Sequence, residues 1–154
     1  MIKNNILIKF ILIIFITSCG FKPMNQIVNF KIEEIELNGD RRINFFLKNK
    51  LINMENKNGE KLYLQIKTNK TKSIKEKNIK NEITKYEVII TSVVHLKIIE
   101  KRYDKIFTIS SKGELKVANQ YSGTLDNEKN LVNSLTNDLL KKITQNIAKE
   151  INAY

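Results

Sequence analysis

The chain has 154 residues and a formal net charge of +11, with 27 lysines and arginines against 16 aspartates and glutamates. One histidine, one cysteine and no tryptophan exclude a disulfide within the chain and a metal centre built from cysteine and histidine ligands. Because no phosphate-binding glycine loop and no nucleophile-elbow motif occurs, we expect a protein that is not an enzyme and that binds no cofactor and no metal ion.

The first residues have the pattern of a bacterial lipoprotein signal. Two lysines precede the apolar run over residues 10–16, which is much shorter than the roughly 20 residues that span a bilayer but has the length of a secretory signal core. In Ile16-Thr17-Ser18-Cys19, a small residue precedes the cysteine and an aliphatic one stands three places before it. We predict that residues 1–18 are a signal peptide and that Cys19 becomes the acylated first residue, carrying palmitate or similar chains. An ordinary signal peptide with an incidental cysteine is the alternative.

The residues after Cys19 indicate where the protein is sorted and where its domain begins. In bacteria that sort lipoproteins, an acidic residue after the cysteine often retains the protein in the inner membrane, so Gly20 favours the outer one. Several acyl chains anchor a protein stably, since each buried methylene contributes roughly 0.8 kcal/mol. We predict a lipidated N-terminus and tether over residues 19–29, followed by a single α+β domain over residues 30–154.

The first element of this domain is a predicted strand over residues 30–37, which mix apolar and acidic side chains. Phe30 and Ile32 share one face of this strand, whereas Ile35 and Leu37 share the other. A β-bulge would turn all four to the same side, and an edge position is the other option.

A helix is predicted next. Asp40 is a suitable N-cap for a helix that begins at Arg41, because its carboxylate can accept the free N–H groups of the first turn. The apolar residues that follow share one helical face: Ile43, Phe46, Leu47, Leu51 and Met54. Residues 56–59, which are polar and end in glycine, are expected to stop the helix.

Three strands are predicted in the middle of the chain, together with a basic stretch. Residues 61–68 alternate cleanly between apolar and polar side chains. Residues 82–99 give the strongest strand signal and are long enough for a bend or bulge near Ser92. The partner strand is predicted over residues 103–121, with a possible kink at Lys112-Gly113. The basic residues 67–80 are interpreted as a solvated hairpin loop.

A long amphipathic helix is predicted at the end of the chain. Its apolar residues recur every fourth position: Leu131, Leu135, Leu139, Ile143, Ile147 and Ile151. The predicted order is therefore strand, helix, three strands and helix. The simplest fold that buries these apolar stripes together is an α+β two-layer sandwich, in which two helices cover one face of a mostly antiparallel four-stranded sheet.

Few side chains are candidates for chemistry. Glu33, Glu34 and Glu36 stand close together, but no base or nucleophile is recognisable beside them, so a solvated strand face is expected. His95 lies within the predicted strand over residues 82–99 and is expected on its less apolar face. The lysine excess accompanies many isoleucines and asparagines, as AT-rich codons would produce, and an exported protein is not expected to bind nucleic acid.

Four segments resemble the LptE family of lipopolysaccharide-assembly lipoproteins: the start Cys19-Gly20-Phe21-Lys22-Pro23-Met24, the helix motif Arg41-Arg42-(x)4-Leu47-(x)3-Leu51, the strand Lys85-Tyr86-Glu87-Val88-Ile89-Ile90 leading to Leu96, and Tyr121 before the long helix. The start is similar to the family's Cys-Gly-Phe-basic-Pro-Leu, with Met24 where leucine is usual. The likeness covers nearly the whole mature chain, and its specific part is the motif at the cysteine.

The resemblance implies a function in the outer membrane. Proteins of the LptE family act as plug and assembly partner of a large β-barrel, LptD, and help to deliver lipopolysaccharide to the outer leaflet. We therefore expect a lipid-anchored outer-membrane protein, facing the periplasm or within a barrel lumen, whose lysines contact lipopolysaccharide phosphates. The candidate contacts are Lys70, Lys72, Lys75 and Lys77. The alternatives are an accessory or pilot subunit of another secretion or transport complex and, less favoured, an envelope enzyme.

Overall fold

The computed structural model describes residues 29–153. The predicted signal peptide, the predicted acylation site Cys19 and residues 20–28 of the predicted tether lie outside the described residues, as does Tyr154. The lipoprotein signal and the tether therefore stay predictions.

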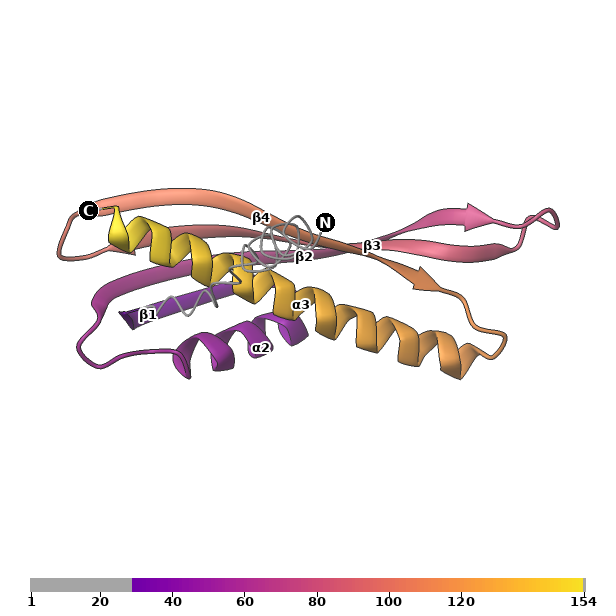
Figure 1. Ribbon diagram of the computed structural model, residues 1–154, viewed down its shortest axis with the longest axis horizontal. Coiled ribbons are helices and arrows are strands. Elements are labelled where there is room, and N and C mark those ends of the chain that lie inside the picture. Colours follow the sequence, from indigo (N-terminus) through magenta and orange to yellow (C-terminus); the bar gives the residue numbers. More distant parts are fainter. Residues whose placement is uncertain (1–28, 154) are drawn as a thin grey trace, which may run out of the picture.

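Within residues 29–153, four strands and two helices follow one another in the predicted order (Figure 1). The elements are β1 (Phe30–Gly39), α2 (Arg41–Ile52), β2 (Glu60–Lys77), β3 (Ile83–Ile98), β4 (Tyr103–Lys116) and α3 (Tyr121–Asn152). The strands form one sheet in the order β1-β2-β3-β4, in which β1 is parallel to β2 and the other neighbours are antiparallel. The predicted α+β class with a mostly antiparallel four-stranded sheet is confirmed.

Both helices contribute to one hydrophobic core on the same side of the sheet. Its fully buried members come from every layer and include Leu47 of α2, Leu64 of β2, Leu96 of β3 and Leu139 of α3. The long helix α3 runs along most of the sheet (Figure 1). No helix within residues 29–153 combines the length and the apolar character needed to cross a membrane.

The start of the domain agrees with the sequence in detail. The register between β1 and β2 shifts between Ile32 and Glu34, and β1 is also an edge strand, so both expectations for this strand are confirmed. The bulge places Phe30 in the core and lets Ile35 and Leu37 pack against it. Asp40 caps α2, since its Oδ1 accepts hydrogen bonds from the N–H groups of Arg42 and Ile43 at 3.0 and 3.1 Å.

The prediction of a loop over residues 67–80 is wrong for most of that stretch. Strand β2 continues from Thr68 to Lys77 and pairs with the first half of β3. The physical reason lies in the partner strand, whose apolar residues Val88 and Ile90 are buried and require a neighbour. Only residues 78–82 form the connection between the two strands.

No register shift occurs at the predicted irregularities of β3 and β4. Fully buried Ser92 pairs with Thr68 on one side and Ile109 on the other in unbroken register, so there is no bulge at this position. Gly113 likewise stands in unbroken register with Val88. A Cβ atom at Gly113 would lie 2.7 Å from Leu131 Cδ1 of α3, so this glycine allows close approach of the helix to the sheet.

The boundary between the last strand and the last helix differs from the prediction. Strand β4 ends at Lys116, and α3 already begins at Tyr121, where the sequence predicted that the strand would end. The predicted apolar stripe of this helix is confirmed, because its residues from Leu135 to Ile151 are buried and Leu131 packs partly buried against the core. The first helical turns carry mostly polar residues and were not recognised.

Candidate functional site

The predicted lysine contacts lie on one long hairpin, whose outer half we call the basic arm: residues 67–77 of β2 with residues 83–93 of β3. Asn78 orders its turn, because Asn78 Oδ1 accepts hydrogen bonds from the N–H groups of Lys80 and Glu82 at 2.9 and 3.0 Å. Asn78 Nδ2 also donates to Glu82 Oε2 at 2.7 Å. Ile79, within this turn, is fully exposed. The arm is therefore an ordered structure with lysines along it.

Lys70 and Lys72 share one carboxylate of α3. Their Nζ atoms lie 3.6 and 2.6 Å from the two oxygens of Glu128, and Lys72 Nζ is also 4.5 Å from the centre of the Tyr86 ring. The hydrogen bond from Lys72 is the main cause that lowers the pKa of Glu128. Two cations therefore share one carboxylate as their ion-pair partner.

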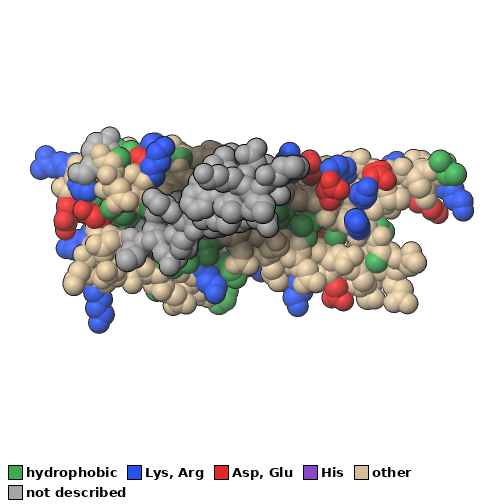
Figure 2. Space-filling model, viewed as in Figure 1, with side chains coloured by type: hydrophobic (Ala, Val, Ile, Leu, Met, Phe, Trp, Pro, Cys, Tyr) green, Lys and Arg blue, Asp and Glu red, His purple; other side chains and the backbone are tan. Residues whose placement is uncertain are grey.

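The other two candidate lysines have different partners. Lys75 Nζ contacts Glu114 Oε1 of β4 at 2.6 Å, and this hydrogen bond lowers the pKa of Glu114. Lys77 Nζ donates to the amide oxygen of Asn81 at 3.0 Å and has no carboxylate partner among the described residues. In Figure 2, basic and acidic side chains are interspersed at the end of the molecule that carries the arm. The structure thus brings Lys70 and Lys72 together but does not gather all four lysines into one cluster.

The candidate catalytic side chains lie on the open face of the sheet, away from the core. His95 Nε2 is 2.5 Å from Asp104 Oδ1. Glu36 Oε2 accepts a hydrogen bond from Gln65 at 2.8 Å, and Glu33 Oε1 is paired with Lys31 at 2.8 Å. Within residues 29–153, no group of three or more histidine, cysteine or acidic side chains is arranged to hold a metal ion.

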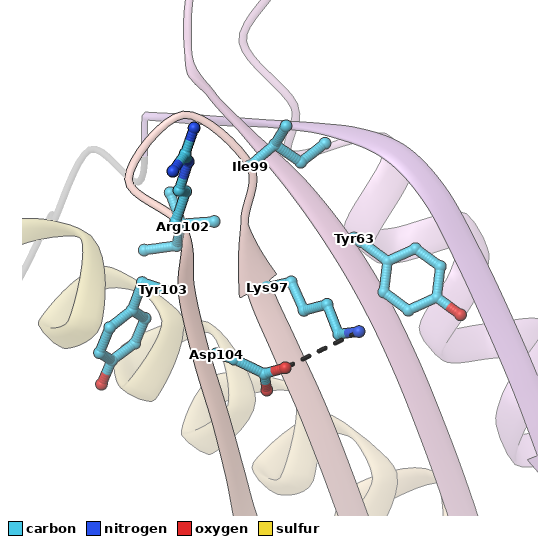
Figure 3. A pocket seen from close by; sticks show the side chains of 7 residues that line it. Tyr63, Lys97, Ile99, Arg102, Tyr103 and Asp104 are labelled. Atoms are coloured by element: carbon cyan, nitrogen blue, oxygen red, sulfur yellow. Dashed lines mark ion pairs between the residues drawn. The ribbon is translucent and has the colours of Figure 1, made fainter.

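A pocket of about 450 Å³ lies at the turn between β3 and β4 (Figure 3). Tyr63, Lys97 and Asp104 form its side on the sheet, and Ile99, Arg102 and Tyr103 line the rest. Lys97 Nζ lies 3.7 Å from Asp104 Oδ2 and 5.6 Å from the centre of the Tyr63 ring. Asp104 therefore contacts His95 through Oδ1 and Lys97 through Oδ2.

A larger cleft of about 640 Å³ separates the start of α2 from the first half of α3. Its apolar residues are Ile43, Leu125 and Val132, and its cations are Arg42, Lys70 and Lys129. Asp40, Asp126 and Glu128 are the acidic residues of the cleft. It lies beside the basic arm, because Lys70 belongs to both.

No family model and no curated protein matches this sequence, but solved structures match the fold. Rare lipoprotein B from Shewanella oneidensis has a TM-score of 0.61 and 14% sequence identity, over 78% of this chain and 98% of that chain. The uncharacterized lipoprotein B from Nitrosomonas europaea has a TM-score of 0.62 and 16% identity, over 87% and 94%. A candidate lipoprotein from Caulobacter crescentus CB15 has 0.58 and 10%, over 82% and 93%. The chain has the fold of these lipoproteins.

Sequence reasoning missed the residues that organise the basic arm. Glu128 binds two of its lysines, but 56 residues separate it from Lys72, and no periodic pattern marks it. Asn78 was not recognised because the whole stretch was interpreted as a loop. The cleft was missed as well, since its walls come from α2, α3 and β2 and meet only through the fold.

Proposed function

We propose that this chain is an outer-membrane lipoprotein, anchored through acylated Cys19, that binds an LptD-like β-barrel and assists lipopolysaccharide assembly. The observation that carries the proposal is the shared fold, which spans nearly the full length of the lipoprotein B structures. The lipoprotein signal over residues 1–19 supports it independently, because that signal is a pattern of the sequence and not of the fold.

The surface of the domain is compatible with such a partner. The lumen of an outer-membrane barrel is polar, and the side chains on the open face of the sheet are largely polar, among them Gln65, Lys67 and Thr91. Most apolar side chains of the sheet instead pack under the two helices, whereas Val93 and Ile106 are exposed. A body of this kind can lie against or within a barrel without exposing its core.

The direct test is isolation of the native complex. The full chain, with an affinity tag after Tyr154, is purified from detergent-solubilised envelopes, and co-purifying proteins are identified by mass spectrometry. A large outer-membrane β-barrel that stays bound in detergent supports the proposal. A secretin or an inner-membrane transporter in its place would point to the accessory or pilot subunit, and a chain that purifies alone would contradict both.

The proposal includes no catalytic step. We expect His95→Gln and Glu34→Gln to complement a deletion strain to the level of the unaltered chain, because both side chains lie on an open strand face. Growth of the complemented strains on detergent-containing medium measures the integrity of the outer membrane. Failure of either variant to complement, at normal protein abundance, would favour an envelope enzyme.

Four lysines of the basic arm are proposed to contact the phosphates of lipopolysaccharide: Lys70, Lys72, Lys75 and Lys77. Replacing Lys70, Lys72, Lys75 and Lys77 with glutamine is expected to weaken binding of purified lipopolysaccharide by roughly tenfold at low salt and by much less at high salt, since exposed charges contribute little individually and salt screens them. A matched variant removes the same charge at the other end of the domain: Lys48, Lys50, Lys57 and Lys61 to glutamine. Equal losses in both variants, or binding that does not respond to salt, would contradict a specific contact.

A further inference from the structure

Strand β1 ends before β2 does, so one edge of β2 is free beyond the end of β1. Strand β1 pairs with β2 as far as Gly39 and Thr68, whereas β2 continues to Lys77. Gly39 has a φ of +100°, and a Cβ atom there would lie 1.8 Å from the Thr68 carbonyl oxygen. The N–H of Asp40 donates to that oxygen at 3.3 Å, and α2 begins at the next residue. Among the described residues, no strand follows β1 along this edge, and residues 69–77 are all exposed.

The backbone groups that face the free edge can be assigned from the ladder. Lys61 bonds toward β3, because its carbonyl accepts from Ile99, whereas Thr68 bonds toward β1, because its carbonyl accepts from Asp40. Successive residues of a strand direct their N–H and C=O groups to opposite sides. The groups of Lys70, Lys72 and Ile74 therefore point to the free edge, and those of Thr71 and Ser73 bond to β3.

The cleft between the helices lies next to this edge. Lys70 belongs to both, and Arg42, Ile43 and Val132 line the cleft beyond it. A strand added to β2 in line with β1 would turn alternate side chains toward the helices, since side chains alternate between the two faces of a sheet. A volume of about 640 Å³ gives room for such side chains.

The charges along the edge favour an acidic occupant. Lys70 and Lys72 share a single carboxylate, and Lys77 has an amide oxygen as its partner. Arg42 and Lys129 have no ion pair among the described residues. They line the cleft together with Asp126 and Asp40. The Asp40 carboxylate already accepts hydrogen bonds as the cap of α2. The net charge of the side chains along the edge is positive, so a segment that carries carboxylates is attracted to it electrostatically.

We propose that the free edge of β2, from Lys70 to Ile74, binds a short extended acidic segment of a partner protein as an added strand, with its inward side chains in the cleft. Strand addition at an exposed edge is a recurrent mode of peptide binding, in which the backbone supplies affinity and pockets supply specificity. The inference deepens the proposed function, and it rests on that function only in assuming that a partner protein exists.

Two other occupants make different predictions. The described residues are preceded by 20–28, which contain no acidic residue, so the chain's own N-terminal part lacks the complementary charge. The lysines alone can also serve to keep an exposed edge from pairing with other chains. In that case their removal would cause self-association, and no acidic segment would bind.

The test is amide hydrogen exchange of the full chain in detergent micelles, followed by NMR. The probe is a capped seven-residue peptide of alternating valine and glutamate, and the matched control has lysine in place of glutamate. In the free protein, the amides of Lys70 and Lys72 should exchange rapidly and those of Thr71 and Ser73 slowly. Saturation with the acidic peptide should slow Lys70 and Lys72 by about tenfold or more, as one net hydrogen bond implies. No slowing, or equal slowing with the lysine peptide, would overturn the proposal.

Two variants at one position separate backbone pairing from charge. Lys72→Pro removes the side-chain charge and also the backbone N–H that faces the free edge, but it breaks no hydrogen bond to β3. Lys72→Gln removes only the charge and keeps that N–H. We expect Lys72→Pro to raise the Kd of the acidic peptide about tenfold and Lys72→Gln about two- to threefold. Equal losses in the two variants, with unchanged circular dichroism, would reduce the contact to electrostatics and overturn strand addition. The exchange experiment on the unaltered chain decides the question if Lys72→Pro does not fold.

The failures of the two proposals are distinguishable. If a barrel co-purifies with the chain but neither peptide nor barrel protects the Lys70 and Lys72 amides, strand addition fails and the proposed function stands. If the acidic peptide protects these amides but no barrel is found, the docking edge stands and the partner is a different envelope protein. If Lys72→Gln self-associates and the unaltered chain binds no peptide, strand addition fails. The lysines then serve only to keep the exposed edge from pairing with other chains.

Discussion

Replacing Cys19 with serine is expected to remove the protein from the outer-membrane fraction. Serine cannot form the thioether through which the acyl chain is attached, so the lipoprotein peptidase should leave the signal uncleaved. Because each acyl methylene contributes roughly 0.8 kcal/mol to membrane binding, losing the chains should lower the amount in the outer membrane by about a hundredfold. Mass spectrometry of the N-terminal peptide and membrane fractionation measure the two effects.

The fractionation needs one precaution and one control. A chain with a formal net charge of +11 adsorbs to anionic lipid without an anchor, so membranes are washed at high salt, which screens that attraction. Ser18→Ala keeps a small residue before the cysteine and should be acylated and sorted as the unaltered chain is. Acylated peptide from Cys19→Ser, or the same outer-membrane content in both variants, would contradict the assignment.

The sequence predicts the fold best where each element carries its own signal. The strand at Leu62, Leu64 and Ile66 alternates between apolar and polar residues, and the stripe from Leu135 to Ile151 has helical spacing. Local chemistry also placed the start of α2, since the Asp40 cap is read from adjacent residues. In these cases the spacing of residues close together in the chain indicates which face is buried.

The same reasoning fails where a segment takes its structure from another one. The lysines beyond Thr68 carry no apolar alternation, and they are in a strand because β3 offers a partner edge for them. Glu128 and Glu114 then neutralise part of their charge from α3 and β4. The early turns of α3 follow the same rule, since extending a helix that is already nucleated costs little even for polar residues.

The candidate site was predictable in composition and not in geometry. Lysines at positions 70, 72, 75 and 77 were identified from the charge run alone. Their separation into a pair on Glu128, one on Glu114 and one on Asn81 depends on the twist and pairing of the whole hairpin. The free edge of β2 depends in turn on where β1 stops, and that is decided by one residue, Gly39.

Gly39→Ala is expected to lower the free energy of unfolding by about 3–5 kcal/mol. Two causes act together: a φ of +100° strains any residue with a side chain by roughly 1–3 kcal/mol, and a Cβ atom 1.8 Å from the Thr68 oxygen must push β1 away from β2. Urea unfolding of the mature domain, followed by circular dichroism, measures the change. Asn38→Ala is the matched control, because Asn38 precedes Gly39 in the same strand and is exposed, and its loss should stay below about 1 kcal/mol.

The Gly39 variant also connects stability to the proposed docking edge. If separation of the two strands is the cause of the loss, the amide of Asp40, which bonds to the Thr68 oxygen at 3.3 Å, should lose its protection from exchange. The amides of Thr71 and Ser73, which bond to β3, should keep theirs up to the lowered limit of global unfolding. A loss below 1 kcal/mol, or unchanged protection of Asp40, would mean that the chain can leave the sheet at Thr68 without glycine. The end of β1 would then not be set by that residue.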